Sequence, residues 1–383
     1  LGASLFVEVT SRSGVFTWMA IKLTRQSGGD PWRLLIAYGV LTVLFSAMLN
    51  NVTAMIIVGS LTVVSLQKLN RHELLLGFLL VEGLLTNVGG LLTLISSVPN
   101  IIVGKIAGIS FVKFFLIAAP YVVLSGAATL LLGRRAFGIH GLADEAERKA
   151  AREQVENFDP NENVPSERFF WFSVAALVLF ITCLAAQPKL PAFKDLGMGF
   201  VALLFAGVVL VAYKHEVDKF YAAVDWDLLA FFAGLFVVIN TMEHAGVLAE
   251  IGRWLSAVLK LPRFLDASVL LGASAAASSV TDNIPLAAML AKILAIDPTV
   301  QAAQPVSASP FWWSVIFGAN LGGNITPIGS ASTVVAMTII HRHGLPLSFF
   351  GFVRHAALFA AVQLVLAMLY VAMLSALGIL VAG

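Results

Sequence analysis

The stretch GANLGGNITPIGSAST, residues 318–333, lies inside a strongly apolar chain but consists mainly of Gly, Asn, Thr and Ser, with one Pro. A lipid-facing helix avoids these residues, because an unpaired polar group in hydrocarbon is costly. A helix that breaks around a solute uses them, since glycines let the backbone turn and let a solute approach closely. The stretch therefore predicts a discontinuous helix with a substrate site at the middle of a membrane.

The composition of the chain indicates a polytopic α-helical membrane protein. Of its 383 residues, 59% are hydrophobic and 12% are charged, and the mean hydropathy is +0.90. A soluble domain carries about 25% charged residues, and apolar runs of roughly 18 residues or more recur along this chain. The net charge of +2 gives no sign of a nucleic-acid partner, and the single Cys183 excludes an internal disulfide.

The first 132 residues predict the first membrane-embedded half of the chain. Residues 32–67 form two arms of about 15 residues around a polar tip at Asn50–Thr53. Because a span needs about 20 residues, these arms favour a re-entrant hairpin. The other predicted segments are an apolar helix over 1–20, a half-helix over 73–88, a break over 89–100 and a span over 111–132.

Residues 133–168 predict an aqueous linker, with one short amphipathic helix near 144–157. Six Lys and Arg residues among eight acidic ones place this linker in the cytoplasm by the positive-inside rule. Residues 169–383 predict the second half. Its segments are spans over 169–187, 197–213 and 226–244, an interrupted segment over 264–296, a broken helix over 309–342 and a last span over 352–380.

The two halves are related by an internal repeat. Gly14 and Gly246 lie 232 residues apart, as do Asn51 and Asn283, and Gly89 and Gly322 lie 233 apart. Each half reads as a helix, a hairpin, a broken helix and a span, which is an architecture of secondary transporters. The number of crossings predicts inverted topology. Two spans precede the matched helix of the second half only, so we expect two N-terminal helices that this chain lacks or that the natural protein has lost.

The hairpin tips and helix breaks supply the candidate ligands of a substrate or ion. Broken helices leave carbonyls and amides unpaired, their C-termini suit cations, and their N-termini suit anions or neutral oxyacids. A contact in helix packing is the alternative role for any single Ser or Thr. The candidates are Asn50, Asn51, Thr53, Thr93, Ser96, Ser97, Asn100, Asp282, Asn283, Asn324, Thr326, Ser330, Ser332 and Thr333.

Three acidic residues are candidates for coupling transport to protonation. Asp282 lies at a predicted hairpin tip within an apolar segment, where carboxylates are expensive and usually functional. We expect it to be buried and able to exchange protons, although it could also cap the helix that starts near Pro285. Glu82 and Glu8 are further relay or coordinating candidates.

No catalytic or metal constellation is evident in the sequence. His341 and His343 flank Arg342 where a helix should reach water, and this placement does not predict a metal site. The chain contains no HExxH, phosphate-binding loop or nucleophile elbow, so an enzyme or ATP-driven pump is unsupported. No cofactor is expected apart from a transported or co-transported sodium ion or proton.

The motifs FSAMLNNVTAMIIVG, GGLLTLISSVPNIIVGK, SSVTDNIPLAAML and GANLGGNITPIGSASTVVA resemble the repeated signatures of the ion transporter superfamily. The most similar branch holds arsenite permeases, NhaD-type sodium/proton antiporters, the P protein and citrate-transporter-like proteins. This resemblance implies an all-α fold, hairpin tips and helix breaks that meet at one central site, an elevator-type movement and often a homodimer. Asn50 stands where many antiporter-like relatives have an acidic residue, and Ser332-Thr333 replaces the Pro99-Asn100 of the first break.

Together these observations predict a multi-pass inner-membrane protein that moves a small ion or oxyacid with a sodium or proton gradient. Cation/proton antiport is favoured, because no Arg or Lys lies within either break to neutralise a multiply charged anion. The alternatives are a permease for arsenite, silicic acid or a carboxylate, and a passive facilitator of a neutral solute.

Overall fold

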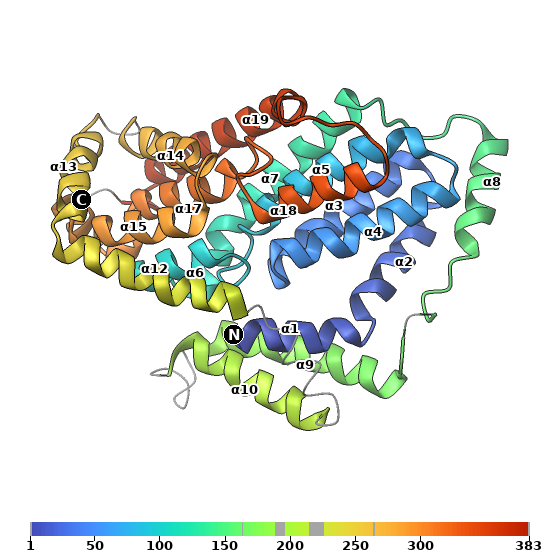
Figure 1. The fold of residues 1–383 in the computed structure, drawn as a ribbon, viewed down its shortest axis with the longest axis horizontal. Coiled ribbons are helices and arrows are strands. Elements are labelled where there is room, and N and C mark those ends of the chain that lie inside the picture. The colour runs from blue at the N-terminus through green and yellow to red at the C-terminus, as the bar shows by residue number, and fades with distance from the viewer. Residues whose placement is uncertain (1, 163, 188–195, 214–225, 263–264, 382–383) are drawn as a thin grey trace. The chain divides into compact units, whose positions relative to one another are not determined.

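The computed structural model describes all residues except 1, 163, 188–195, 214–225, 263–264 and 382–383. Over the described residues every regular element is a helix (Figure 1). The all-helical membrane architecture predicted from composition is therefore confirmed. The chain divides into two compact units: residues 1–37, 110–112 and 141–234 form unit 1, and the remaining residues form unit 2.

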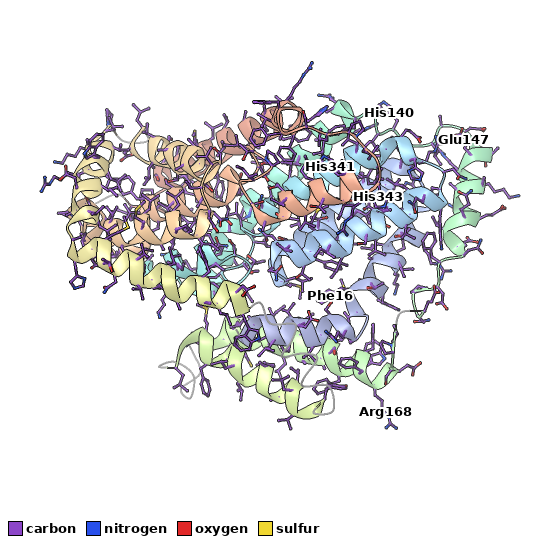
Figure 2. All side chains as sticks on the ribbon, viewed as in Figure 1. Phe16, His140, Glu147, Arg168, His341 and His343 are labelled. Atoms are coloured by element: carbon purple, nitrogen blue, oxygen red, sulfur yellow. The ribbon has the colours of Figure 1, made fainter. Side chains whose placement is uncertain are left out.

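Unit 1 gathers helices from the N-terminus, from the linker and from the start of the second half of the chain. Its helices are α1 (Gly2–Arg12), α2 (Val15–Ser27), α8 (Glu145–Glu156), α9 (Glu167–Ala186) and α10 (Gly197–Ala212). Helix α1 packs on α9 and α10 through the ring of Phe6, whose centroid lies 4.6 Å from that of Phe180 and 5.8 Å from that of Phe205. In Figure 2, Phe16 marks α2, Glu147 marks α8 and Arg168 marks the start of α9.

The prediction of one helix over residues 1–20 is wrong. Gly14 adopts φ 82°, a left-handed conformation, and separates α1 from α2. Most side chains are strained at such a φ, whereas glycine accepts it without cost. Gly246 ends α12 (Trp226–His244) and precedes α13 (Val247–Leu259) in the same way, with φ 77°. The glycine pair found in the sequence thus marks two equivalent helix breaks.

The first hairpin consists of α3 (Pro31–Met48) and α4 (Asn51–Lys68), with Asn50 between them. Each arm has 18 residues, so the predicted length of about 15 is wrong. Asp30 caps the start of α3, because its Oδ1 accepts a hydrogen bond from the Arg33 amide at 2.9 Å. Both arms are long and apolar enough to cross a membrane, so the length of the arms no longer argues for re-entrance here.

The second hairpin is shorter and matches its prediction. It consists of α14 (Leu265–Ser278) and α15 (Asn283–Ile296), which have 14 residues each. These lengths fall below a span of about 20 residues. A short α16 (Pro298–Gln301) and the 3-10 turn η4 (Val306–Ala308) follow.

Both predicted broken helices are present. Turn η1 (His72–Leu74) leads into α5 (Leu75–Gly89), and α6 (Val98–Ala107) follows the first break. Helices α17 (Pro310–Gly322) and α18 (Ala331–Arg342) flank the second break. Each pair continues into a long apolar helix, α7 (Phe111–Ala136) or α19 (Phe349–Ala376).

The two halves of the sequence pack against each other reciprocally within unit 2. Helix α15 of the second hairpin packs on α6, which follows the first break. Helix α4 of the first hairpin packs on α18, which follows the second break (Figure 1). The second arm of each hairpin, α4 or α15, therefore packs against helices that flank both breaks. Among the described residues, six helices are long and apolar enough to span a membrane: α3, α4, η1 joined to α5, α7, α9 and α19.

Candidate functional site

Glycines at the end of each half-helix let a hairpin arm approach it closely. A Cβ built on Gly89 would lie 2.7 Å from both the Cα and the carbonyl oxygen of Val43 on α3. A Cβ on Gly322, its repeat partner, would meet the Ala275 carbonyl oxygen and would lie 2.7 Å from the Ser278 Cβ on α14. No real Cβ fits at either position, so both glycines are required for the contact between hairpin and broken helix.

Matched hydrogen bonds tie each hairpin to its broken helix. Ser46 Oγ donates to the Thr86 carbonyl and Ser278 Oγ donates to the Ala319 carbonyl, both at 2.6 Å. These donors lie 232 residues apart and their acceptors 233, which are the offsets of the sequence repeat.

The threonines inside the two breaks form a second matched pair. Thr93 Oγ1 donates to the Ala47 carbonyl at 2.6 Å, and Thr326 Oγ1 donates to the Ser279 carbonyl at 2.5 Å. Both threonines were predicted as ligands, but here each hydroxyl fixes a hairpin. The donors of these two contacts lie 233 residues apart, and their acceptors lie 232 apart.

Asn50 and Asp282 cap the second arms of the two hairpins. Asn50 Oδ1 accepts from the Thr53 amide at 2.7 Å, and Asp282 Oδ1 accepts from the Ile284 amide at 2.9 Å. Asp282 is exposed, contrary to the expected burial, because the cap places it on the tip of the hairpin outside the packed helices. The neighbouring Asn283 is half-buried.

Asn87, a residue that the sequence analysis did not select, lies at the centre of the site. Its Oδ1 accepts from Asn51 Nδ2 at 3.2 Å, so it contacts the first hairpin tip. Its Nδ2 donates to Asn324 Oδ1 at 2.8 Å and to Ser330 Oγ at 3.0 Å, both in the second break. Asn87 is fully buried and joins three of the predicted ligands. Its place immediately before Val88-Gly89-Gly90, matched by Asn320 before Leu321-Gly322-Gly323, was the available sequence signal.

Ser96 and Asn100 hold the first break together. Ser96 Oγ and Asn100 Nδ2 donate to the Gly90 carbonyl at 2.5 and 2.7 Å. Asn100 Oδ1 accepts from Asn320 Nδ2 at 2.9 Å, which joins the first break to the second half of the sequence. Ser97 is buried as the residue before α6. The Oδ1 atom of Asn320 is buried without a hydrogen-bond partner among the described residues.

Ser330, Ser332 and Thr333 hold the second break. Ser330 Oγ accepts from the Thr333 amide at 3.3 Å and thereby caps α18. Thr333 Oγ1 donates to the Ser330 carbonyl, 2.7 Å away, and Ser332 Oγ lies 2.8 Å from Thr86 Oγ1 on α5. Ser332 and Thr333 are buried, whereas Ser330 is half-buried. Ser330 is therefore the hydroxyl of this group most open to a ligand.

Glu82 is fully buried where α5 packs on α4 and α18. Its Oε1 accepts a hydrogen bond from Thr62 Oγ1 at 2.5 Å. Its Oε2 has no hydrogen-bond partner among the described residues. Such a carboxyl is costly to bury as an ion, so Glu82 keeps its candidacy for coupling.

Glu8 has a different setting. It lies in unit 1 and forms an i,i+4 ion pair with Arg12, whose Nε is 2.9 Å from Glu8 Oε1. Both side chains are about one-third exposed. A surface pair of this kind stabilises a helix only weakly, and it accounts for Glu8 without a transport role.

The two histidines near the end of α18 contact backbone carbonyls. His341 Nε2 lies 2.7 Å from the Leu347 carbonyl oxygen, and His343 Nδ1 lies 2.9 Å from that of Ile339 (Figure 2). Across the described ranges, no three His, Cys, Asp or Glu side chains group closely enough to hold a metal ion.

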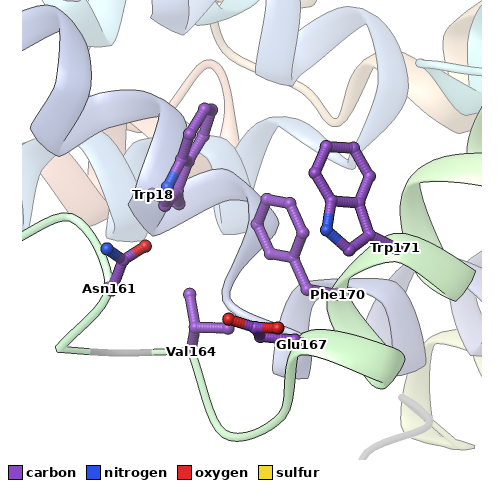
Figure 3. Close-up of a pocket in the computed structure, with 6 residues that line it drawn as sticks. All are labelled: Trp18, Asn161, Val164, Glu167, Phe170 and Trp171. Carbon is purple, nitrogen blue, oxygen red and sulfur yellow. The ribbon is translucent and has the colours of Figure 1, made fainter.

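A pocket of about 240 Å³ lies within unit 1, lined by Trp18, Asn161, Val164, Glu167, Phe170 and Trp171 (Figure 3). The rings of Trp18 and Trp171 each meet Phe170 edge to face, with centroids 5.5 and 5.4 Å away. Lys22 Nζ lies 4.4 Å from the centroid of the Trp18 ring. The rings therefore pack on one another instead of forming an open cage, and none of the predicted site residues lines this pocket.

Comparison with known proteins gives consistent matches. Residues 1–318 match the sequence model of a family described as citrate transporter. An uncharacterized transporter of Mycobacterium tuberculosis is 33% identical over 370 residues, which cover 97% of this chain and 83% of that protein. The human P protein is 25% identical over 425 residues, covering 92% of this chain and 50% of that protein.

A solved structure shares the fold. The YdaH transporter of Alcanivorax borkumensis, whose topology is described as unusual, superposes with a TM-score of 0.66. The alignment covers 100% of this chain and 85% of that one, at 14% sequence identity. This similarity extends to the fold and not to the substrate.

Proposed function

Because the chain belongs to the citrate transporter family, we propose that this multi-pass membrane transporter moves a small carboxylate such as citrate, using a sodium or proton gradient. The observation that carries the proposal is the buried amide and hydroxyl network around Asn87, where a hairpin tip meets both helix breaks. Polar groups are retained inside a membrane where they serve a transported solute. The family and the network together support transport rather than catalysis.

The chemistry around the second break favours an oxygen-rich anion. Helix α18 begins beside Ser330, and α6 begins beside Ser97 in the first break. Free amides and the helix dipole at such N-termini attract negative charge. The hydroxyl of the half-buried Ser330 can add a donor to this attraction. These features and the family model favour a carboxylate over the cation that the sequence analysis preferred.

Cation/proton antiport is the second candidate. The observation that favours it is the absence of any Arg or Lys from residues 89–100 and 318–333. Citrate carries several negative charges, and without a cationic side chain they must be balanced by co-transported ions or helix dipoles. A neutral oxyacid such as arsenous or silicic acid would need no such balance, and it defines the passive alternative.

Asp282 and Glu82 are the proposed coupling residues. Asp282 lies at a hairpin tip, where a cation could accompany the substrate, and Glu82 lies buried between α4, α5 and α18. The proposal includes inverted repeats, an elevator-type movement, a cytoplasmic linker over 133–168 and a homodimer. The matched hydrogen bonds of the two hairpins support the repeat.

The test is uptake of labelled citrate into proteoliposomes under imposed sodium or proton gradients. Wild-type protein should accumulate citrate only when a gradient is present. Asp282→Asn keeps the helix cap, because Asn caps as well as Asp, but it loses the charge. We expect this variant to equilibrate citrate without accumulating it.

Three other outcomes would decide against the proposal. Citrate flux that ignores the gradients in both proteins would indicate a passive facilitator. Sodium or lithium flux against protons, with no citrate flux, would indicate an antiporter. Arsenite flux alone would indicate a permease for a neutral oxyacid.

A further inference from the structure

A chain of buried amide side chains runs away from the site into the helices behind it. Asn87 donates to Asn324 Oδ1, and Asn324 Nδ2 donates to Gln363 Oε1 on α19 at 2.7 Å. Gln363 Nε2 donates to Thr129 Oγ1 on α7 at 2.9 Å. All four side chains are at most 1% exposed, and two of them, Gln363 and Thr129, lie outside every motif of the sequence.

The direction of this chain is fixed by the Leu84 carbonyl, which can only accept, and the Thr129 hydroxyl agrees with it. Thr129 Oγ1 lies 2.8 Å from the Ser125 carbonyl oxygen, and a proton donated to that carbonyl leaves the hydroxyl to accept from Gln363. The amide nitrogen of Gln363 must therefore face Thr129, and its oxygen must face Asn324. Independently, Asn324 Nδ2 donates to the Leu84 carbonyl at 3.0 Å, and a carbonyl cannot donate. Both constraints orient Asn324 with its oxygen toward Asn87.

The orientation of Asn324 determines what Ser330 offers to a ligand. Because Asn324 presents Oδ1, Asn87 must donate Nδ2, and the same Nδ2 also donates to Ser330 Oγ. Ser330 Oγ further accepts from the Thr333 amide. A hydroxyl has two acceptor positions and one proton, so both acceptor positions of Ser330 are filled and its proton remains to donate.

We propose that Gln363 and Asn324 are positioning residues, which orient Asn87 so that the Ser330 hydroxyl donates a hydrogen bond to the transported anion. This inference rests on the function proposed above. It also revises the role of Asn324, because both of its N–H groups and its oxygen are already used. With Asn87 reversed, Ser330 would donate to Asn87 and present an acceptor, which favours a cation.

In the unliganded arrangement the Ser330 proton has acceptors nearby. Ser332 Oγ and Thr333 Oγ1 each lie 3.1 Å from Ser330 Oγ. A carboxylate oxygen would replace these neutral acceptors with a charged one, and hydrogen bonds to charged groups are the stronger kind. Ser330 is half-buried, so its hydroxyl is not fully enclosed by the protein.

The test compares citrate transport by Gln363→Met, Ser330→Ala and the double variant in proteoliposomes. Gln363→Met removes the oxygen that faces Asn324. We expect the KM for citrate to rise about fivefold, which corresponds to the loss of one neutral hydrogen bond. The kcat should be unchanged. Ser330→Ala should raise the KM about tenfold, as for one hydrogen bond to a charged group. The double variant should match Ser330→Ala, because Gln363 acts through Ser330.

An unchanged KM for Gln363→Met, or additive effects in the double variant, would overturn the inference. Wild-type protein that moves no citrate at all would refute the proposed function instead.

Discussion

Replacing Gly89 by alanine tests whether the first hairpin must contact the broken helix. The new Cβ would lie 2.7 Å from the Cα and the carbonyl oxygen of Val43, and 3.0 Å from the Ser46 Cβ. Because two of these three neighbours are backbone atoms, no side-chain rotation can make room. Ordinary contact begins near 3.4 Å, so α3 and α5 must separate by about 0.7 Å.

This separation has two costs and one gain. Overpacking of this kind destabilises by about 1–3 kcal/mol. The Ser46 Oγ hydrogen bond to the Thr86 carbonyl, now 2.6 Å long, would stretch beyond 3.2 Å, which loses about 1 kcal/mol. Alanine stabilises a helix by about 0.5–1 kcal/mol relative to glycine, which offsets part of this loss. The expected net loss of stability is about 1–3 kcal/mol.

Thermal unfolding in detergent and citrate flux in proteoliposomes measure the effect. We expect Gly89→Ala to unfold a few degrees earlier and to lose most of its flux, because Asn51 and Asn87 would be drawn apart. Gly126→Ala on α7 is the control, since its Cβ would meet nothing within 4 Å, and it should be at least as stable as wild type. A Gly89→Ala protein with wild-type stability and flux would refute the close contact.

Three further predictions concern buried or capping polar groups. Glu82→Gln keeps the hydrogen bond to Thr62 but cannot take up a proton. Citrate flux should therefore persist, while the response of that flux to an imposed pH gradient should disappear. An unchanged response would exclude Glu82 from coupling. Thr62→Val should lower the unfolding temperature, because leaving the buried Glu82 acceptor without its donor costs about 1–3 kcal/mol. Thr62→Ser keeps the hydroxyl and should unfold at the wild-type temperature. Asp30→Ala removes the carboxylate that accepts a hydrogen bond from the Leu142 amide at 2.8 Å. Limited proteolysis should then cleave the chain near residue 142 faster than in the wild-type protein. Equal cleavage rates would count against this contact.

Most of the helices could be predicted from the sequence, because a membrane imposes a length and an apolar composition on each span. Helices α7, α9 and α19 agree with the predicted spans over 111–132, 169–187 and 352–380. The prediction over residues 1–20 was wrong because a single Gly14 with positive φ interrupts an otherwise continuous apolar run. A hydropathy profile depends on residue composition and carries no information about the φ angle of a single residue.

The site could be predicted only in part. The breaks were visible because Gly, Asn, Ser and Thr cluster there, and Asn51, Asn324 and Ser330 do contact Asn87. Asn87 itself stands at the end of an apolar half-helix, and Gln363 is a single amide within the span of α19. A single amide gives a weaker signal in sequence than a polar cluster, because partners far along the chain determine whether it is satisfied.

By itself, the sequence determined the membrane class and the two helix breaks, since composition, spacing and glycine placement are local properties of the chain. The tertiary structure decided which groups remain available to a ligand. Hydrogen-bond capacity is shared among side chains from separate helices, so the direction of the chain from Thr129 through Gln363 and Asn324 depends on their meeting in space. That direction leaves Ser330 with a proton to donate.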